Sequence, residues 1–174
     1  MDPLQAIIGD YQTFLKNITA EIAAAGFDFD DFSQMDHMCY RVTTHADYKP
    51  KKQALMAVGA LLGEAQVNGR SISTFRLQKP VRYDRWRIDT VELPAPKEGV
   101  YTKEGLDHVE LVLYDDMQSF MAKHPDKQFK TDAIDRGVNP EISFKLPNYT
   151  VKFHLLSLPT VVYLERKLGI TDIR

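Results

Sequence analysis

The sequence has little cysteine, no long apolar run and no excess of basic charge, and each absence excludes a class of protein. Its 174 residues include one cysteine, Cys39, which excludes an internal disulfide and a thiolate-rich zinc site. No apolar segment approaches the roughly 20 residues that a membrane-spanning helix requires. The N-terminus lacks the basic start and apolar core of a secretory signal, so we expect no membrane partner.

The charge pattern excludes a further group of functions. The chain has 22 Lys and Arg residues against 24 Asp and Glu residues, a net charge of −2, and no basic run that would bind nucleic acid. It also has no Gly-rich phosphate loop, nucleophile elbow or Walker-type motif. Because 44% of its residues are hydrophobic, we expect a cytoplasmic globular protein forming one domain over residues 1–174.

The apolar pattern predicts an α+β protein that begins with a helical extension. Apolar residues recur at i, i+3 and i+4 through residues 3–26, where Pro3 suits a first turn and Gly26 a C-terminal cap. We expect this helix and an acidic, aromatic linker (27–35) to fill residues 1–35. In the rest of the chain, Asn68-Gly69 between two strand-like runs is a strong hairpin signal, and Pro94 to Gly99 resembles a linker.

The remaining elements occur twice in the same order, strand–helix–strand–strand–strand. We therefore predict a first βαβββ module (36–98), a second (106–158) and a C-terminal helix (159–168). In the first module the expected elements are a strand at 36–43, a helix at 45–63, hairpin strands at 65–67 and 71–77, and a strand at 83–93. In the second they are a strand at 106–113, a helix at 115–123, and strands at 141–146 and 149–157.

The first strand of each module begins with Asp-His, at Asp36-His37 and at Asp107-His108. Side chains alternate between the faces of a strand, so the apolar residues around each histidine place His37 and His108 on the face opposite the helices. The same argument turns Glu92 and His154, on the last strands of the modules, toward that concave face.

If the modules pair through a pseudo-twofold axis, these four side chains converge. Three neutral imidazoles and one carboxylate suit a divalent metal ion such as Zn²⁺, Ni²⁺, Co²⁺, Mn²⁺ or Fe²⁺. We therefore predict a shared metal site of His37, Glu92, His108 and His154. The alternative is that the strand histidines are structural residues of the core.

Other side chains on the predicted inward face have two interpretations each. Glu110 is the candidate general acid or base, or it forms an ion pair with Arg41 or Lys152. Arg41 and Lys152 would bind an anionic substrate such as a carboxylate, or neutralise Glu92 and Glu110. Arg70 would reach over the cavity mouth or be solvated. Two further residues have similar alternatives: Trp86 forms a cavity wall or belongs to the core, and Cys39 lies beside the metal or is a small buried hydrophobe.

The chain resembles the YecM-like family of the vicinal oxygen chelate superfamily. The matching stretches cover most of residues 36–157 and include Asp36-His37, Val91-Glu-Leu-Pro94, Asn139-Pro140 and Val151-Lys-Phe-His154. The resemblance implies a glyoxalase/dioxygenase-like fold, in which paired βαβββ modules form a curved mixed sheet that encloses a metal. The superfamily's four ligand positions fall on His37, Glu92, His108 and His154, although many members have Glu at the last.

Three functions follow from this pattern. The first is a metal-dependent enzyme of isomerase, lyase or dioxygenase type, acting on a small oxygen-rich molecule chelated through vicinal oxygens. The second is a non-catalytic module that binds a small ligand in the same cavity, and the third is a structural protein. Because both modules lie in one chain, we expect a monomer.

Overall fold

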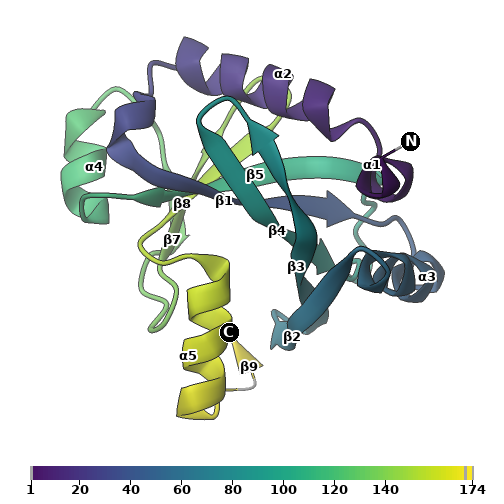
Figure 1. The fold of residues 1–174 in the computed structure, drawn as a ribbon. Helices are drawn as coiled ribbons and strands as arrows, with labels where there is room; N and C mark the ends of the chain where they lie inside the picture. The colour runs from purple at the N-terminus through teal and green to yellow at the C-terminus, as the bar shows by residue number, and fades with distance from the viewer. Residues whose placement is uncertain (1, 171, 174) are drawn as a thin grey trace.

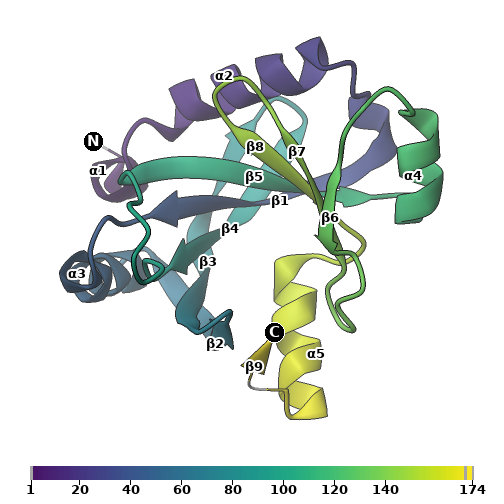
Figure 2. The same ribbon diagram turned by 180° about the vertical axis from the view of Figure 1, so that it is seen from behind.

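The computed structural model describes residues 2–170, 172 and 173, whose strands form one curved mixed sheet flanked by helices (Figures 1 and 2). The N-terminal segment comprises α1 (Pro3–Ile8), α2 (Tyr11–Ala24) and a short 3₁₀ turn, η1 (Phe29–Asp31). The first half then contains β1 (Phe32–Arg41), α3 (His45–Met56), β2 (Gly59–Val67), β3 (Arg70–Tyr83) and β4 (Trp86–Pro94). The second half contains β5 (Gly105–Leu113), α4 (Met117–Lys123), β6 (Lys130–Ala133), β7 (Glu141–Lys145), β8 (Thr150–His154), α5 (Leu158–Leu168) and β9 (Asp172–Ile173).

The strand order β6-β7-β8-β5-β1-β4-β3-β2-β9 shows that the two halves share one topology. In each half the first strand pairs in parallel with the last, β1 with β4 and β5 with β8, and the other two strands lie outside them. The halves join through the antiparallel pair of β1 and β5 at the centre of the sheet. The predicted fold class, paired βαβββ modules forming a curved mixed sheet with an N-terminal helical extension, is confirmed.

The hydrophobic core lies between the sheet and the N-terminal helices. The apolar stripe of α2 is buried as predicted, and Leu15, Ile18 and Ile22 are fully buried. Aromatic rings of the second half also pack on β1: the ring of Phe153 on β8 stacks on that of Phe32 on β1, with centroids 5.6 Å apart. Because this face of the sheet is apolar, polar residues that alternate with it must lie on the opposite face.

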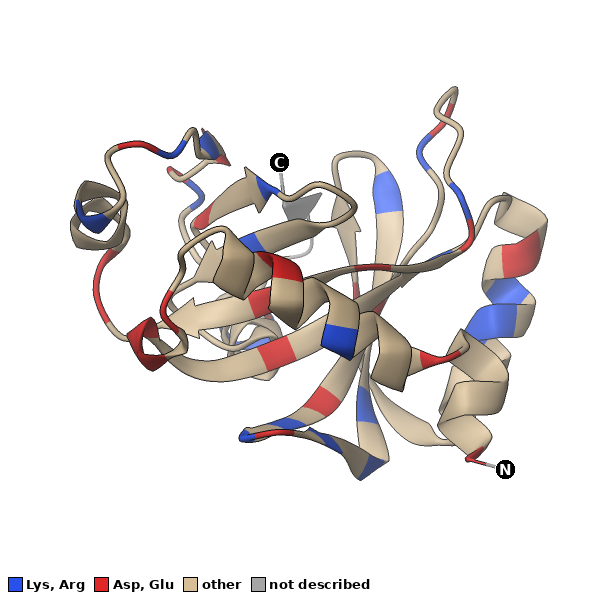
Figure 3. Ribbon diagram, turned by 90° about the horizontal axis from the view of Figure 1, so that it is seen from above, with Lys and Arg blue, Asp and Glu red and all other residues tan. Residues whose placement is uncertain are grey.

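The helix α5 lies on that opposite side, between the ends of the curved sheet near β2 and β7 (Figures 1 and 2). It packs on β2 and β3. Basic and acidic residues are interspersed along the helices and strands (Figure 3), and their numbers nearly balance. Within the described part of the chain, no helix has both the length and the apolarity that crossing a bilayer demands.

Three predicted boundaries in the N-terminal segment and the first half are wrong, and each has a local cause. The helix expected over 3–26 is two helices, because Gly9 has a φ of 82° and Asp10 starts a new helix by accepting a hydrogen bond from the amide of Thr13. The expected 27–35 linker contains η1 and the start of β1, which begins at Phe32. The helix expected over 45–63 ends at Met56, and Gly59 begins a strand.

Two further differences concern strands. Pro80 does not end its strand: β3 continues to Tyr83, and the proline lies where the pairing of β3 with β4 is irregular, between Arg76 and Val81. The short strand β6 lies in a polar stretch where no strand was expected. In contrast, the hairpin at Asn68-Gly69 is confirmed, and both residues have positive φ angles, 50° and 76°.

Gly59 provides a test of this fold, because a β-carbon there would lie 2.7 Å from the carbonyl oxygen of Arg76 on β3. We expect Gly59→Ala to lower the free energy of unfolding by about 1–3 kcal/mol through this overpacking, as measured by urea denaturation. Gly137→Ala is the matched control, because a β-carbon at Gly137 meets no atom within 4 Å. Equal stability of the two variants would contradict the placement of β2 against β3.

Candidate metal centre

Each Asp-His pair lies at a β-bulge where β1 and β5 meet. Met35 pairs with Leu111 and His37 with Glu110, so Asp36 is an extra residue in β1 that has no partner on β5. In the same way Asp107 is the extra residue of β5, between the partners of Cys39 and Tyr40. A bulge interrupts the alternation of side chains, so the aspartate can lie beside the histidine that follows it.

His37 is fully buried and is oriented by Asp36. Its Nδ1 lies 2.8 Å from Oδ2 of Asp36, and because a carboxylate accepts hydrogen bonds, Nδ1 carries the proton and donates it. Its Nε2 lies 3.5 Å from Oε1 of Glu110 and has no hydrogen-bond partner within the described residues. Burial opposes protonation of this ring, but the charge of Glu110 and the hydrogen bond to Asp36 outweigh it and raise the pKa of His37 well above its ordinary value.

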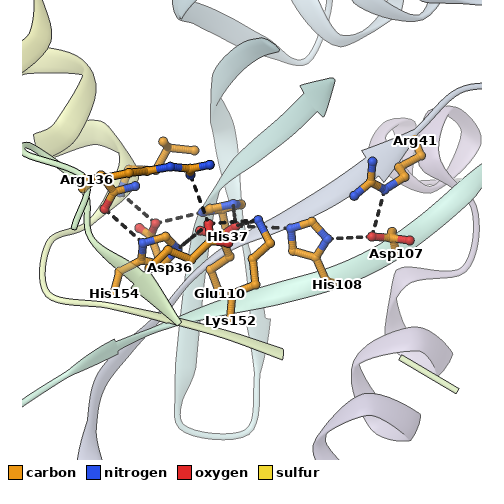
Figure 4. A network of polar contacts seen from close by, with 12 residues as sticks. Asp36, His37, Arg41, Asp107, His108, Glu110, Arg136, Lys152 and His154 are labelled. Carbon is orange, nitrogen blue, oxygen red and sulfur yellow. Dashed lines mark hydrogen bonds and ion pairs between the residues drawn. The ribbon is translucent and has the colours of Figure 1, made fainter. Parts of the chain in front are cut away.

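His108 has the equivalent arrangement in the second half. Its Nδ1 donates to Oδ2 of Asp107 at 2.7 Å, and its Nε2 lies 3.2 Å from Oε1 of Glu110. Arg41 extends this chain, since its Nε lies 2.9 Å from the same Asp107 oxygen (Figure 4). Both imidazoles are therefore held through Nδ1 and direct Nε2 toward the space between β1 and β5, which is how ligand histidines are oriented in metalloproteins.

Glu92 and Glu110 complete this group. On β4, Glu92 pairs with Cys39, two residues beyond the position that pairs with His37. His37, Glu92, His108 and Glu110 each place one ligand atom within 4.8 Å of the others. Burial and the charge of Glu110 oppose ionisation of Glu92, but the charges of His37, Lys152 and His108 outweigh them and lower its pKa.

Glu110 belongs to two clusters. Its Oε1 faces His37, His108 and Lys152, whose Nζ is 2.9 Å away, and its Oε2 contacts Nε2 of His154 (Figure 4). Burial favours its neutral form, yet the charges of His154, His37 and Lys152 hold the pKa of Glu110 well below its ordinary value. Glu110 is thus an ionised carboxylate surrounded by cationic and imidazole groups.

The structure separates His154 from the other three predicted ligands. In the parallel pairs, His37 is opposite Thr90 and His108 is opposite Thr150. Glu92 follows the first threonine by two residues and Lys152 follows the second by two, so Lys152 is the residue equivalent to Glu92. His154 lies two residues farther along β8, opposite Val112. It belongs to a second cluster with Glu110 and Glu141, and its Nδ1 is 3.0 Å from Oδ1 of Asn139. The sequence argument treated Glu92 and His154 as equivalent because both lie on last strands, without knowledge of the register.

The other predicted residues fall in two places. Arg41, Lys152 and Arg70 line a cavity of about 1230 Å³, which Glu92, His108 and Glu110 also line. Trp86 does not line it: Phe29 of η1 covers this end of β4, with ring centroids 5.9 Å apart, and the indole is buried in the core. Cys39 is fully buried, and burial together with the charge of Glu92 raises its pKa well above the ordinary value, so the thiol is unreactive.

Several side chains of the site were not expected from the sequence. Asp36 accepts a second hydrogen bond, from the amide of Leu158 at 2.7 Å, and so caps α5, whose N-cap residue Ser157 makes no side-chain cap. Glu165 of α5 is 6% exposed and lines the cavity, and burial raises its pKa. The repeated Asp-His pairs were a signal for Asp36 and Asp107, whereas nothing in the local pattern indicated Glu141 or Glu165.

Lys152 provides a test of the charge balance, because three carboxylates, Glu92, Glu110 and Glu141, lower the energy of its charged form. We expect Lys152→Met to reduce the free energy of unfolding of the metal-free protein by about 2–3 kcal/mol, because it leaves buried carboxylates without their cation. Lys130→Met, at an exposed ion pair with Asp132, is the control and should change stability by less than about 0.5 kcal/mol. Urea denaturation in a chelator would measure both, and similar values would contradict the network.

Comparisons with known protein families, sequences and structures find relatives that match nearly the whole chain. The sequence model of the YecM protein family matches residues 3–165. The YecM protein of Escherichia coli K12 is 29% identical over 181 residues, spanning 95% of this chain and 96% of its own. A solved structure described as Structural Genomics, Protein EC4020 is 29% identical, with a TM-score of 0.76, covering 95% of this chain and 94% of its own. A methylmalonyl-CoA epimerase is 15% identical, with a TM-score of 0.52, covering 73% and 97%.

Proposed function

Because this chain belongs to the YecM family and has the paired-module fold of the vicinal oxygen chelate superfamily, we propose that it binds a divalent metal ion between its halves and acts on a small oxygen-rich molecule held there. The observation that carries the proposal is the pair of Asp-His units at equivalent bulges. Each aspartate fixes Nδ1 of its histidine, and each Nε2 is left to face Glu92 and Glu110.

The donor set suits a divalent transition metal. Two neutral imidazoles and two carboxylates are ligands for Zn²⁺, Mn²⁺, Fe²⁺, Co²⁺ and Ni²⁺, and the two carboxylates would balance the charge of the ion. Nε2 of His37 is fully buried and has no hydrogen-bond partner in the described part of the chain, which supports this, because a buried nitrogen without a partner is costly unless a ligand satisfies it. We propose His37, Glu92, His108 and Glu110 as the ligands.

The predicted ligand His154 then has a different role or replaces Glu110. Nε2 of His154 contacts Oε2 of Glu110 and lies 3.9 Å from Oε2 of Glu141. His154 therefore orients Glu110 and can exchange a proton with Glu110. If His154 is the ligand, Glu110 is free to act as the general base that the sequence suggests. Glu110→Gln and His154→Gln separate these cases, because the variant that removes the ligand loses more metal affinity.

The chemistry follows from the charges around the site. A bound divalent cation would polarise a carbonyl or hold two vicinal oxygens of a substrate. Among this chain's own residues, Glu110, His154 and Glu141 form a contiguous group able to accept and hold a proton, and Nζ of Lys152 lies 2.9 Å from Glu110 and 3.1 Å from Glu141. Glu165 of α5 also lines the cavity, and burial raises its pKa. These groups fit proton transfer next to a carbonyl, and we propose a reaction of the isomerase or lyase type.

A second candidate is a ligand-binding module without catalysis. The observation that favours it is Lys152, a cation at the position equivalent to the ligand Glu92. An ammonium group there, paired with Glu110 at 2.9 Å, reduces the negative charge available to a metal and so favours a cavity that binds its ligand without one. The enzyme is favoured if the protein turns over carbonyl compounds that carry an acidic α-proton. The measurement is exchange of that proton for deuterium in deuterated water.

The ligand assignment predicts metal loss in one variant. We expect His108→Ala to contain less than a tenth of the stoichiometric metal of the unaltered protein, because it removes one of the four proposed ligands. The measurement is elemental analysis of protein purified without a histidine tag or chelator. The control is His45→Ala, which removes an exposed imidazole at the start of α3. Unchanged metal in His108→Ala would refute the assignment.

The orientation of the histidines gives a separate prediction. Asp107→Asn keeps the size of the side chain but makes it a weaker acceptor for Nδ1 of His108. Loss of such a partner costs roughly 10–100-fold in metal affinity, and we expect a decrease of that size in a competition titration with Zn²⁺. An affinity equal to that of the unaltered protein would show that Asp107 does not orient the ligand.

A further inference from the structure

We propose that Arg70 and Lys97, beside Arg41, form an anion subsite at one side of the cavity, so that the substrate is a small acid whose carboxylate or phosphate group is bound there. The inference deepens the proposed function, since it names the substrate class for the same cavity. The three residues come from different elements: Arg41 ends β1, Arg70 begins β3, and Lys97 lies in the loop after β4. All three line the cavity together with Glu92 and His108.

The placement of Arg70 follows from the register of β3. Thr74 is opposite Glu92 and Ile72 is opposite Pro94. Every second residue of a strand lies on the same face, so Arg70, Ile72 and Thr74 share the face that carries Glu92. All three line the cavity. Nη1 of Arg70 donates to the carbonyl oxygen of Ala95 at 3.1 Å, which fixes the side chain across the start of the loop that carries Lys97. Arg70 is thereby held over the cavity.

Arg70 has unmet hydrogen-bonding capacity. Its guanidinium is half-buried, its Nε has no hydrogen-bond partner, and it forms no ion pair with a carboxylate among the described residues. A guanidinium offers five N–H donors in a fork that matches a carboxylate or phosphate. The known partner, Ala95, uses one of them. A half-buried cation with unused donors favours binding of an anion from outside the chain.

The neighbouring charges are of the same sign. Burial and the charge of Arg41 lower the pKa of Arg70, although Glu92 acts in the opposite sense. Partial burial and the charges of Arg70 and Arg41 lower the pKa of Lys97, which also has no carboxylate partner in the described chain. Asp107 is the acidic group of this corner that forms an ion pair, and it is engaged by both Arg41 and His108. Among the described residues, Arg41 is thus the one cation of these three that forms an ion pair, although Glu92 lines the same cavity.

The chain Arg41–Asp107–His108 connects this subsite to the proposed metal site (Figure 4). A substrate can therefore reach both, with its oxygen-bearing end toward Glu92 and His108 and its anionic group toward Arg70 and Lys97. A second cationic group in the cavity, Lys152, is excluded from this role because Glu110 and Glu141 neutralise it at 2.9 and 3.1 Å.

The test is isothermal titration with two probes, malonate for the dicarboxylates and inorganic phosphate for the phosphates. We expect the protein to bind at least one probe, and the combined variant Arg70→Gln and Lys97→Gln to bind it at least 10-fold more weakly, with unchanged metal content and unfolding midpoint. Whichever probe binds more tightly identifies the anion. The control Lys145→Gln removes another cavity-lining cation, on β7, and should retain the affinity.

The outcomes separate the subsite from the metal proposal, because the titration is repeated after exhaustive chelation. Binding that depends on Arg70 and Lys97 in the chelated protein supports the subsite even if no metal is ever found. Equal affinity of the double variant and the unaltered protein for both probes would overturn the subsite while leaving the metal proposal intact. Failure of the unaltered protein to bind either probe below about 10 mM would overturn it as well.

Discussion

The candidate site depends on the hydrogen bond between each aspartate and the histidine that follows it. Neighbouring side chains of a regular strand point to opposite faces, so an aspartate cannot hydrogen-bond the histidine that follows it there. The bulges at Asp36 and Asp107 remove that restriction, and each carboxylate fixes Nδ1 of its imidazole at 2.7–2.8 Å. The Nε2 atoms of both rings are then directed toward Oε1 of Glu110, at 3.5 Å from His37 and 3.2 Å from His108. The two bulges lie at equivalent points of the two halves, which places the site on the pseudo-twofold axis.

The same carboxylates connect the site to its surroundings. Asp36 caps α5 as well as holding His37, so the helix that borders the cavity is attached to a proposed ligand. Asp107 joins His108 to Arg41 at the cationic side of the cavity. Glu110, between the imidazoles and Lys152, balances the charge where the halves meet. The duplication therefore builds a symmetric pair of histidines, whereas the residues around them differ between the halves and would determine which molecule binds.

The fold was predictable because its signals are local and repeated. The order of elements recurs in both halves, the Asn68-Gly69 turn is specific, and the alternation around His37 and His108 identifies their face. Boundaries failed where one apolar run fits two periodicities, as at residues 59–63, or where Gly9 interrupts a helical stripe. The equivalence of Glu92 with Lys152, and not with His154, depends on strand register across residues far apart in the chain. Register is fixed by packing of the whole sheet, which no local pattern reveals.

The most direct test of the central claim is anomalous diffraction from crystals of the protein purified without chelator, with data collected above and below the absorption edge of the metal it contains. The account predicts a single strong anomalous peak between Nε2 of His37 and Nε2 of His108, within bonding distance of both nitrogens and of a carboxylate oxygen of Glu92. A metal-containing crystal whose peak lies at another place, with the two histidines still bonded only to Asp36 and Asp107, would contradict it.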